Sequence, residues 1–273
     1  MIKAIAVLYE AFWEFRQDDG PALAGYIAFS GLLGFFPFII LTTNIAALTL
    51  GEGQSQQAVD ALFAYAPPHV AQTLEPVLLD VLRGAGSGLL TLSALAAVWF
   101  SSNAFEAIRM SFDRAYNVPE PRGWFTGRLI SIACVFGGTI ASILLGFLIV
   151  LGPLAIQLIE GWFGITIPFF AEVARYAIGL LVFLIFISVL HFVLPRHRIP
   201  FRKLWVGVIV STLIWVVAAT GFSVYLGYTP TYVTTYGALA GVVITLVFLY
   251  ITGMAIIYGA EVNAVLARGR MTG

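Results

Sequence analysis

Charged residues are scarce in this sequence. Asp, Glu, Lys and Arg together make up 10% of the 273 residues, whereas hydrophobic residues make up 60%. A water-soluble domain carries about 25% charged residues, so this chain has too few to cover a surface that faces water. The formal net charge is 0, which gives no general attraction to nucleic acid. The composition predicts an integral membrane protein with no nucleic-acid partner.

Cysteine, histidine and catalytic motifs are also missing or rare. The single cysteine, Cys134, excludes an internal disulfide and a cysteine-based zinc site. The three histidines are not spaced as metal ligands on one element. No serine-hydrolase elbow, zinc-protease motif or phosphate-binding loop occurs in the sequence. We therefore predict no catalytic residue, no metal site, no cofactor and no enzymatic activity.

The first twenty residues are acidic and amphipathic. Glu10, Glu14, Asp18 and Asp19 stand where a secretory signal would need an apolar core, so no such signal is predicted. Apolar residues recur between them at near-helical spacing. Residues 1–20 are therefore predicted to form a helix that either lies in the membrane interface or packs against the membrane spans.

Six apolar segments are long enough to cross a bilayer, which takes about 20 residues each. Their approximate ranges are 23–50, 88–107, 129–151, 174–194, 204–226 and 236–262. With the N-terminus inside, twelve of the fourteen Lys and Arg residues fall on the inner side. The positive-inside rule then places both termini in the cytoplasm. We predict an all-α integral membrane protein with six transmembrane helices and one membrane domain over residues 1–273.

The outer segment 51–87 separates the first two predicted spans. It contains two amphipathic helical patterns that Pro67 and Pro68 interrupt. We expect an outer helical segment that packs on the mouth of the bundle or lies in the interface. It is also the natural place for an envelope protein partner to bind.

Polar residues inside the predicted spans carry a free-energy cost and therefore mark candidate functional positions. The predicted set is Asn44, Ser102, Asn103, Glu106, Arg109, His191, Glu261 and Asn263. Two interpretations remain open, a structural hydrogen-bond network and a polar pathway that opens inward. Ser102, Glu106, Arg109 and Asp113 share one helix face, so Arg109 is placed to pair with both acids. Glu261 is the candidate for proton coupling.

A compact basic turn follows the fourth predicted span. Its cationic residues are Arg196, Arg198, Arg202 and Lys203. They lie where anionic lipid headgroups are found. They predict either a headgroup-binding site or a simple topological signal.

The first predicted span contains a helix breaker. Pro37 removes a backbone hydrogen bond, and Gly34 next to the freed carbonyl leaves space for a neighbour or a water. We predict a kink at Gly34 and Pro37 that faces the interior of the bundle. Small residues at four-residue spacing elsewhere serve packing within one bundle and are equally compatible with a homo-oligomer.

Four stretches in this order resemble the YihY/BrkB family of bacterial inner-membrane proteins. They are "GYIAFSGLLGFFPFII", "VWFSSNAFEAIRMSFDRAYNVPEPRGWFTGR", "VLPRHRIPFRKLWVGVIVSTLIWVVAATGFSVYL" and "YGALAGVVITLVFLYITGMAIIYGAEVNAVL". The sequence departs from the family pattern at Gly34, Asp113 and Phe248, where serine, asparagine and tryptophan are usual.

The resemblance implies six spans in the inner membrane and associations with serum resistance and envelope lipid transport. The family was once labelled a ribonuclease, but this sequence lacks the His/Asp metal centre that such a nuclease needs. The predicted function is a transporter or flippase-like protein for a lipid or other amphipathic anion, with anionic membrane lipids as partners. The alternative is an envelope scaffold that acts through residues 51–87.

Overall fold

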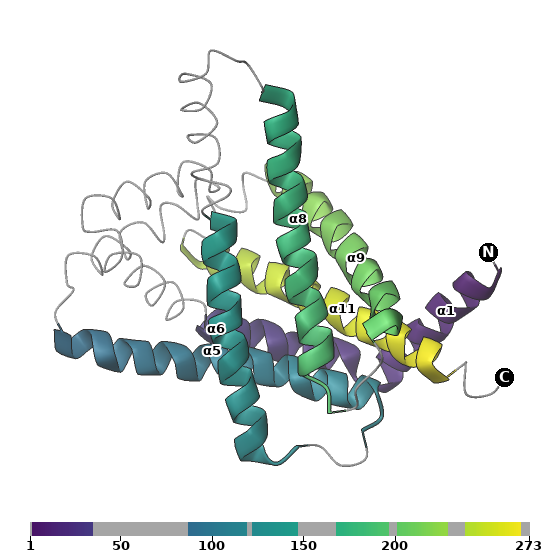
Figure 1. Ribbon diagram of the computed structural model, residues 1–273, viewed down its shortest axis with the longest axis horizontal. Helices are drawn as coiled ribbons and strands as arrows, with labels where there is room; N and C mark the ends of the chain where they lie inside the picture. Colours follow the sequence, from purple (N-terminus) through teal and green to yellow (C-terminus); the bar gives the residue numbers. More distant parts are fainter. Residues whose placement is uncertain are drawn as a thin grey trace.

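The computed structural model describes residues 2–34, 87–118, 122–146, 168–196, 201–228 and 238–268. All regular secondary structure in these ranges is helical (Figure 1). The helices are α1 (Ile2–Gln17), an unlabelled helix Gly20–Gly34, α5 (Ser87–Ala115), α6 (Trp124–Gly146), α8 (Pro168–Val193), α9 (Phe201–Tyr228) and α11 (Ala238–Arg268). The prediction of an all-α protein holds for these ranges.

Five of the six predicted spans coincide with α5, α6, α8, α9 and α11, and the first is described only as far as Gly34. Three stretches are long and apolar enough to cross a membrane, namely Trp124–Ser142, Leu204–Leu226 and Gly241–Arg268. The number of six spans and their orientation stay predictions. The outer segment 51–86 lies outside the described residues.

Helix α5 continues well past the predicted end of its span at residue 107 and ends at Ala115. Its polar last turns are stable because their side chains find partners inside the protein, as described below. Asn117 follows in the left-handed conformation, with φ of 49°. The amides of Asn117 and Val118 donate to the carbonyls of Arg114 and Asp113, both at 2.9 Å, which is a Schellman cap.

The N-terminal helix α1 packs along α11 and is separated from the helix Gly20–Gly34 by a turn at Asp18 and Asp19. Asp19 has a φ of 55°, and this left-handed residue changes the direction of the chain. Ala11 and Phe15 are buried against α11, whereas Tyr9 and Trp13 on the same helix remain exposed. Helix α1 thus packs on a predicted span and also presents an aromatic face outward.

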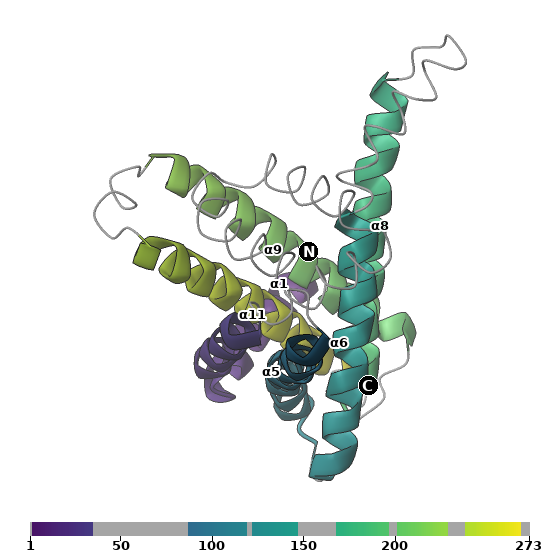
Figure 2. The ribbon, with the colours of Figure 1, turned by 90° about the vertical axis from the view of Figure 1, so that its left-hand side faces the viewer.

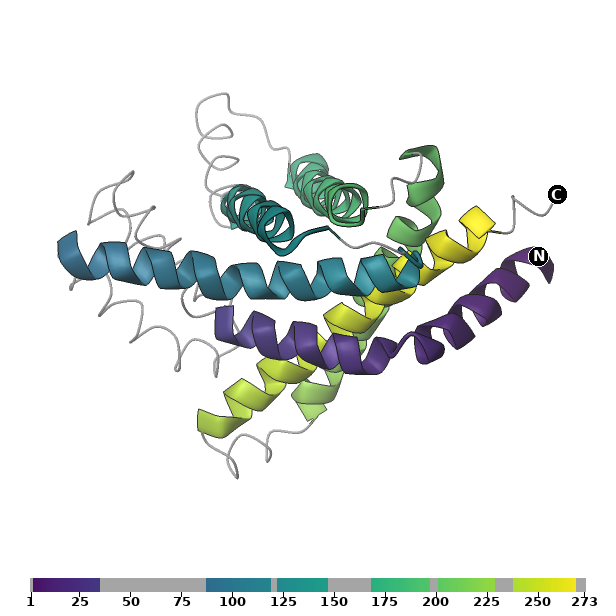
Figure 3. The same cartoon turned by 90° about the horizontal axis from the view of Figure 1, so that it is seen from below.

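The helix Gly20–Gly34 runs antiparallel to α5, as the view from below makes visible (Figure 3). At one end Asp19 pairs with Arg114 at 3.0 Å. At the other end Ser101 Oγ donates to the carbonyl of Gly34 at 3.1 Å. A Cβ on Gly34 would lie only 2.7 Å from the Cα of Ser101, so glycine permits this close approach.

Among the described helices, α9 and α11 form the most extensive pair and lie side by side (Figure 2). Gly207 and Gly259 face each other, and a Cβ on either would overlap the backbone of the other helix. Further along the pair, Trp215 Nε1 donates to Thr252 Oγ1 at 3.0 Å. Trp215 also packs edge-on against Phe248. The buried core joins this pair to α5 and α8 through Phe112, Leu194, Val208 and Ile257, which belong to one cluster.

Candidate functional site

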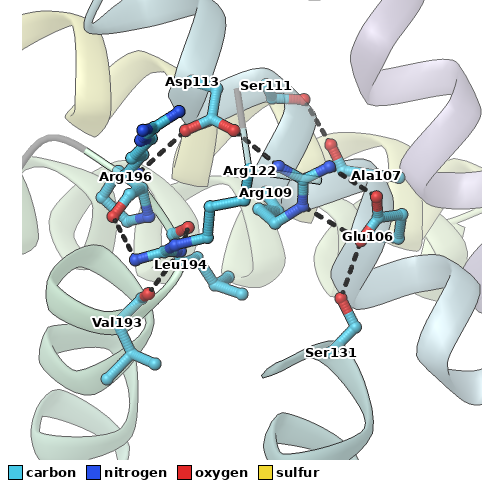
Figure 4. A network of polar contacts seen from close by, with 11 residues as sticks. Glu106, Ala107, Arg109, Ser111, Asp113, Arg122, Ser131, Val193, Leu194 and Arg196 are labelled. Carbon is cyan, nitrogen blue, oxygen red and sulfur yellow. Dashed lines mark hydrogen bonds and ion pairs between the residues drawn. The ribbon is translucent and has the colours of Figure 1, made fainter. Parts of the chain in front are cut away.

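A polar face runs along the last turns of α5 and is centred on Arg109 (Figure 4). Arg109 donates through Nε and NH2 to the two oxygens of Glu106, at 3.0 and 2.5 Å. Its NH1 donates to Asp113 Oδ2 at 2.6 Å. Both pairs that the helical spacing predicted are present, and the three side chains are largely buried. Asp113, a departure from the family pattern, is thus an integral member of the network.

The same carboxylates connect α5 to its neighbours (Figure 4). Ser131 on α6 donates from Oγ to Glu106 Oε2 at 2.9 Å. The backbone amide of Arg196, just after α8, donates to Asp113 Oδ1 at 3.0 Å. A continuous chain of polar contacts therefore runs from α6 through α5 to the segment that follows α8. We call the residues Glu106, Arg109, Asp113 and Ser131 the α5 network.

Arg122, which precedes α6, caps the C-terminal end of α8. Its NH1 donates to the carbonyls of Val193 and Leu194 at 3.1 and 2.7 Å, and its NH2 donates to that of Pro195 at 3.2 Å. The last carbonyls of a helix lack partners within the helix and carry partial negative charge. One guanidinium satisfies the carbonyl of Val193, the last residue of α8, and the two carbonyls that follow it, and so ties the segment before α6 to the end of α8.

Arg128 on α6 forms a second cationic centre, on the Trp99–Asn103 stretch of α5. Its NH1 donates to Asn103 Oδ1 at 2.7 Å and its NH2 to the carbonyl of Trp99 at 2.9 Å. The guanidinium carbon lies 3.8 Å from the centre of the Trp99 ring, a cation–π contact. Nε of Arg128 is buried and has no partner within the described residues. Ser102 donates to the same Trp99 carbonyl at 2.8 Å.

The remaining predicted polar residues sit elsewhere in the core. Asn263 on α11 accepts from the amide of Gly207 at 2.8 Å and donates to the carbonyl of Leu204 at 3.1 Å. His191 on α8 is buried and stacks on Phe112, with 4.6 Å between ring centres. Glu261 is fully buried on α11. The seven predicted polar residues that the structure describes therefore do not form one cluster.

An acidic cluster that the sequence analysis did not predict lies between α1 and α11. Single carboxylate oxygens of Glu14, Asp18 and Glu261 all lie within 4.8 Å of one another. The prediction of no metal site rested on spacing within one element, whereas these three residues come from opposite ends of the chain. They are the described carboxylates that are placed to hold a metal ion together.

A largely apolar cavity of about 340 Å³ lies among the helix Gly20–Gly34, α5, α6 and α8. Gly34, Ser101, Phe105, Gly138 and Phe186 are among its lining residues. Ser101 lies on α5 between Trp99 and Asn103, the two residues that hold Arg128. Residues two positions apart on a helix face different sides, and none of Trp99, Asn103 and Arg128 lines the cavity, so the cavity and the Arg128 centre use different faces of the same stretch of α5.

Several predicted positions cannot be placed in this arrangement. Asn44, Pro37 and Arg198 lie outside the described residues, so the predicted kink is not described. Arg202 and Lys203 fall in the first turn of α9. Arg196 contributes its backbone amide to Asp113 and is exposed.

Comparison with known proteins places this arrangement in a family. A family model described as virulence factor BrkB matches residues 11–273, which is nearly the whole chain. The chain belongs to the virulence factor BrkB family. The expectation from the four sequence stretches is thereby confirmed at the level of the family.

Relatives of this BrkB-family chain include proteins from several bacteria. A ribonuclease-like protein of Bacillus subtilis, YfkH, is 30% identical over 267 residues, covering 96% of this chain and 95% of the relative. A UPF0761 membrane protein of Alkalilimnicola ehrlichii is 25% identical, and this chain spans 56% of its length. One of Alteromonas mediterranea is 25% identical, and 82% of it is covered. No solved structure matches the chain.

These relatives support a membrane protein and leave its activity open. The word ribonuclease occurs in the name of the Bacillus protein and belongs to that protein alone. The names of the other two relatives say only that they are membrane proteins. The BrkB-family chain is therefore a membrane protein whose function has to be argued from its site.

Three features of the site went unpredicted. Arg122 and Arg128 were counted only as topological charges, and Glu14 only as part of an amphipathic pattern. The signal available in the sequence was the position of these three charged residues near the ends of predicted spans. At a span end, a charged side chain can reach polar groups that are buried between the helices. Their actual partners lie between 25 and 254 residues away and depend on how the helices pack.

Proposed function

We propose that this BrkB-family protein is a six-span transporter of the bacterial inner membrane that moves an amphipathic anion, with lipid as the substrate class. The buried Arg128, together with an apolar cavity that the same stretch of α5 lines, carries this proposal. A guanidinium suits a phosphate or carboxylate headgroup, and an apolar cavity suits the hydrocarbon part of the same molecule.

The proposed topology has both termini in the cytoplasm. Contacts among helix ends support it, because the ends that the positive-inside rule assigns to one side lie together. Asp113 near the end of α5 meets the segment after α8, Arg122 before α6 meets the same segment, and the start of α9 meets the end of α11. In a bundle whose successive spans alternate in direction, the ends of α5, α8 and α11 and the starts of α6 and α9 all lie on the cytoplasmic side. This arrangement brings these ends together.

A free hydrogen-bond donor supports a headgroup contact at Arg128. Arg128 donates to neutral oxygens of Asn103 and Trp99. Its Nε retains one donor without a partner among the described residues. The charge of Arg128 is already offset in part by the nearby carboxylate of Glu106, so the support comes from this buried donor, which a headgroup oxygen would satisfy.

A second apolar groove supports a substrate with long hydrocarbon chains. This groove of about 450 Å³ runs between α6 and α8 and is lined by residues such as Cys134, Ile140, Val182 and Phe186. Ala141 and Phe186 also line the cavity of about 340 Å³. The two apolar spaces therefore meet at these two side chains, and acyl chains would have room on both sides of them.

Reconstitution tests the proposal directly. The purified protein is placed in liposomes with a fluorescent anionic phospholipid, and movement between leaflets is measured with a membrane-impermeant quencher, with and without ion gradients. We expect movement above protein-free vesicles, a drop of about tenfold in Arg128→Gln, and no change in Arg16→Gln, which removes an exposed arginine of α1. No movement above protein-free vesicles under any gradient would refute the proposal.

The headgroup requirement has its own control. The same assay with a labelled zwitterionic phospholipid should show slower movement, because the cationic amine of such a headgroup competes with Arg128 for the phosphate. Equal rates for both lipids, and equal rates in wild type and Arg128→Gln, would contradict the assignment of Arg128 as the headgroup contact.

A further inference from the structure

Three carboxylates from the two ends of the chain converge between α1 and α11. Glu14 lies in the last turn of α1, Asp18 follows directly after that helix, and Glu261 lies near the end of α11. One carboxylate oxygen from each lies within 4.8 Å of the other two. Acidic clusters are common on protein surfaces, but in this cluster one carboxylate, that of Glu261, is fully buried.

The burial of the Glu261 carboxylate is a second observation that points to a bound ligand. Its side chain has a relative exposure of 0%, and neither of its oxygens has a hydrogen-bond partner among the described residues. Asp18 Oδ2 is likewise buried without a partner. An ionised carboxylate in such a position costs several kcal/mol, on the order of the penalty for any buried unpaired charge. Some group has to neutralise these oxygens in the folded protein.

The charges that face the cluster do not balance it. Glu14 pairs with Arg268 on α11, with 2.7 Å between Oε2 and NH2. Arg114 on α5 is engaged by Asp19 at 3.0 Å. Tyr116 on α5, near Glu261, is a neutral hydroxyl whose pKa is raised by burial. Three carboxylates and one guanidinium therefore leave two negative charges, which is the charge that one divalent cation carries in the opposite sign.

We infer that Glu14, Asp18 and Glu261 form a binding site for a divalent cation of the Mg²⁺ or Ca²⁺ class. Oxygen-only ligands suit these hard cations. Two oxygens bound to one Ca²⁺ at about 2.3–2.6 Å lie at most about 5 Å apart, which accommodates the observed cluster. Mg²⁺, with its shorter bonds of about 2.0–2.1 Å, would need bridging waters or a small inward movement of the side chains.

The site also has an entry route. Glu14 is only partly buried, with a side-chain exposure of 26%. An ion would reach Asp18 and Glu261 past Glu14, between the last turns of α1 and α11. Bound there, it would hold the N-terminal helix onto the last helix. This inference concerns cation binding and does not depend on the transport proposed above.

Manganese binding tests the site. The protein is purified in a neutral detergent, freed of metal with a chelator, exchanged into chelator-free buffer and titrated with Mn²⁺, with free ion measured by electron paramagnetic resonance. We expect one saturable Mn²⁺ per chain, displaced by Ca²⁺ or Mg²⁺. Absence of saturable binding in the wild-type protein would overturn the inference, since the carboxylates would then be neutralised by protons.

Variants assign the binding to these residues. Glu261→Gln and Asp18→Asn should each weaken Mn²⁺ binding at least tenfold, whereas Glu10→Gln, an exposed glutamate on the same α1 helix, should leave it unchanged. Asp18 is partly exposed, so its variant keeps the test valid even where Glu261→Gln fails to fold. Equal Mn²⁺ affinity in wild type and Asp18→Asn would place the bound ion elsewhere and overturn the assignment.

Discussion

The amide of Gly207 donates to Oδ1 of Asn263 at 2.8 Å, although 56 residues separate them in the chain. This contact exists because α9 and α11 approach each other at Gly207 and Gly259, where neither helix carries a side chain. The buried side chain of Asn263 therefore hydrogen-bonds directly to the backbone of the neighbouring helix. The pair fixes the register of the two helices that contain the longest apolar stretches.

Substitution of Gly207 by alanine should destabilise this pair. The added methyl would overlap the Gly259 backbone and the Asn263 amide, and overpacking of this kind costs about 1–3 kcal/mol. We expect a lower melting temperature for Gly207→Ala in detergent. Gly221→Ala on the same helix is the matched control, because a Cβ there meets nothing within 4 Å. Equal melting temperatures for the two variants would contradict the close contact.

The contact of Gly34 with α5 gives a second prediction. A Cβ on Gly34 would meet the Cα of Ser101 at 2.7 Å and the carbonyl of Phe100 at 3.1 Å. Gly34→Ala should therefore push the helix Gly20–Gly34 away from α5 and lower the melting temperature by several degrees. Gly25→Ala, on the same helix with open space around it, should have no such effect. A stabilised Gly34→Ala protein would show that this helix can move aside freely.

Replacement of Arg122 by lysine should loosen the end of α8. A single ammonium group cannot reach the three carbonyls that the planar guanidinium satisfies. We expect faster amide hydrogen exchange at the last turn of α8, measured by mass spectrometry. Arg114→Lys serves as the control, because Arg114 makes an exposed pair with Asp19. Unchanged exchange in Arg122→Lys would mean that the cap adds nothing to the stability of this turn.

The acidic cluster predicts a pH dependence in the absence of divalent cations. Burial, and then the neighbouring charge of Glu14, raise the pKa of Asp18 above its ordinary value of 3.8. A raised carboxyl pKa stabilises the fold fully below the unfolded-state pKa, and this stabilisation is lost as pH rises through the folded-state pKa. In chelator, Asp18→Asn should therefore become more stable than wild type as pH increases toward neutrality.

Divalent cation should reverse that order. With Ca²⁺ at saturation the wild-type protein gains binding free energy that Asp18→Asn cannot gain, so its melting temperature should rise more. Melting curves of both proteins across pH, with chelator and with Ca²⁺, provide the measurement. Parallel curves for the two proteins under all these conditions would mean that the ionised Asp18 carboxylate does not destabilise the fold and does not bind the divalent cation.

Local features of this fold could be predicted from the sequence. Apolar segments located five of the helices, and the spacing of Glu106, Arg109 and Asp113 predicted both of their ion pairs. Such contacts are set within one helix, where residues three or four positions apart always lie on the same face. The same spacing predicted that the helix continues past the predicted span end at residue 107 as far as Asp113, and α5 ends at Ala115. The partners of its polar last turns, on α6 and after α8, could not be predicted from that spacing.

Contacts between helices could not be predicted in the same way. Nothing in the sequence near Arg128 indicates that it lies over Trp99, and nothing near Glu14 indicates Glu261. These pairs depend on the angles at which helices cross, which a single sequence does not encode in a readable pattern. The positive-inside rule explains Arg122 and Arg128 as charges on the inner side of the membrane. It does not indicate which acceptors these two side chains bind.

The ion pair between Glu14 and Arg268 links residues that are 254 positions apart. A ribosome makes α1 before α11, so α1 cannot reach its final position until α11 has been synthesised. Until then, Ala11 and Phe15 lack the surface that buries them, and Glu14 and Asp18 have no partner from α11. Completion of the last helix is therefore the step that locks the first one in place, and a chain truncated before α11 would leave its own N-terminal helix without a docking surface.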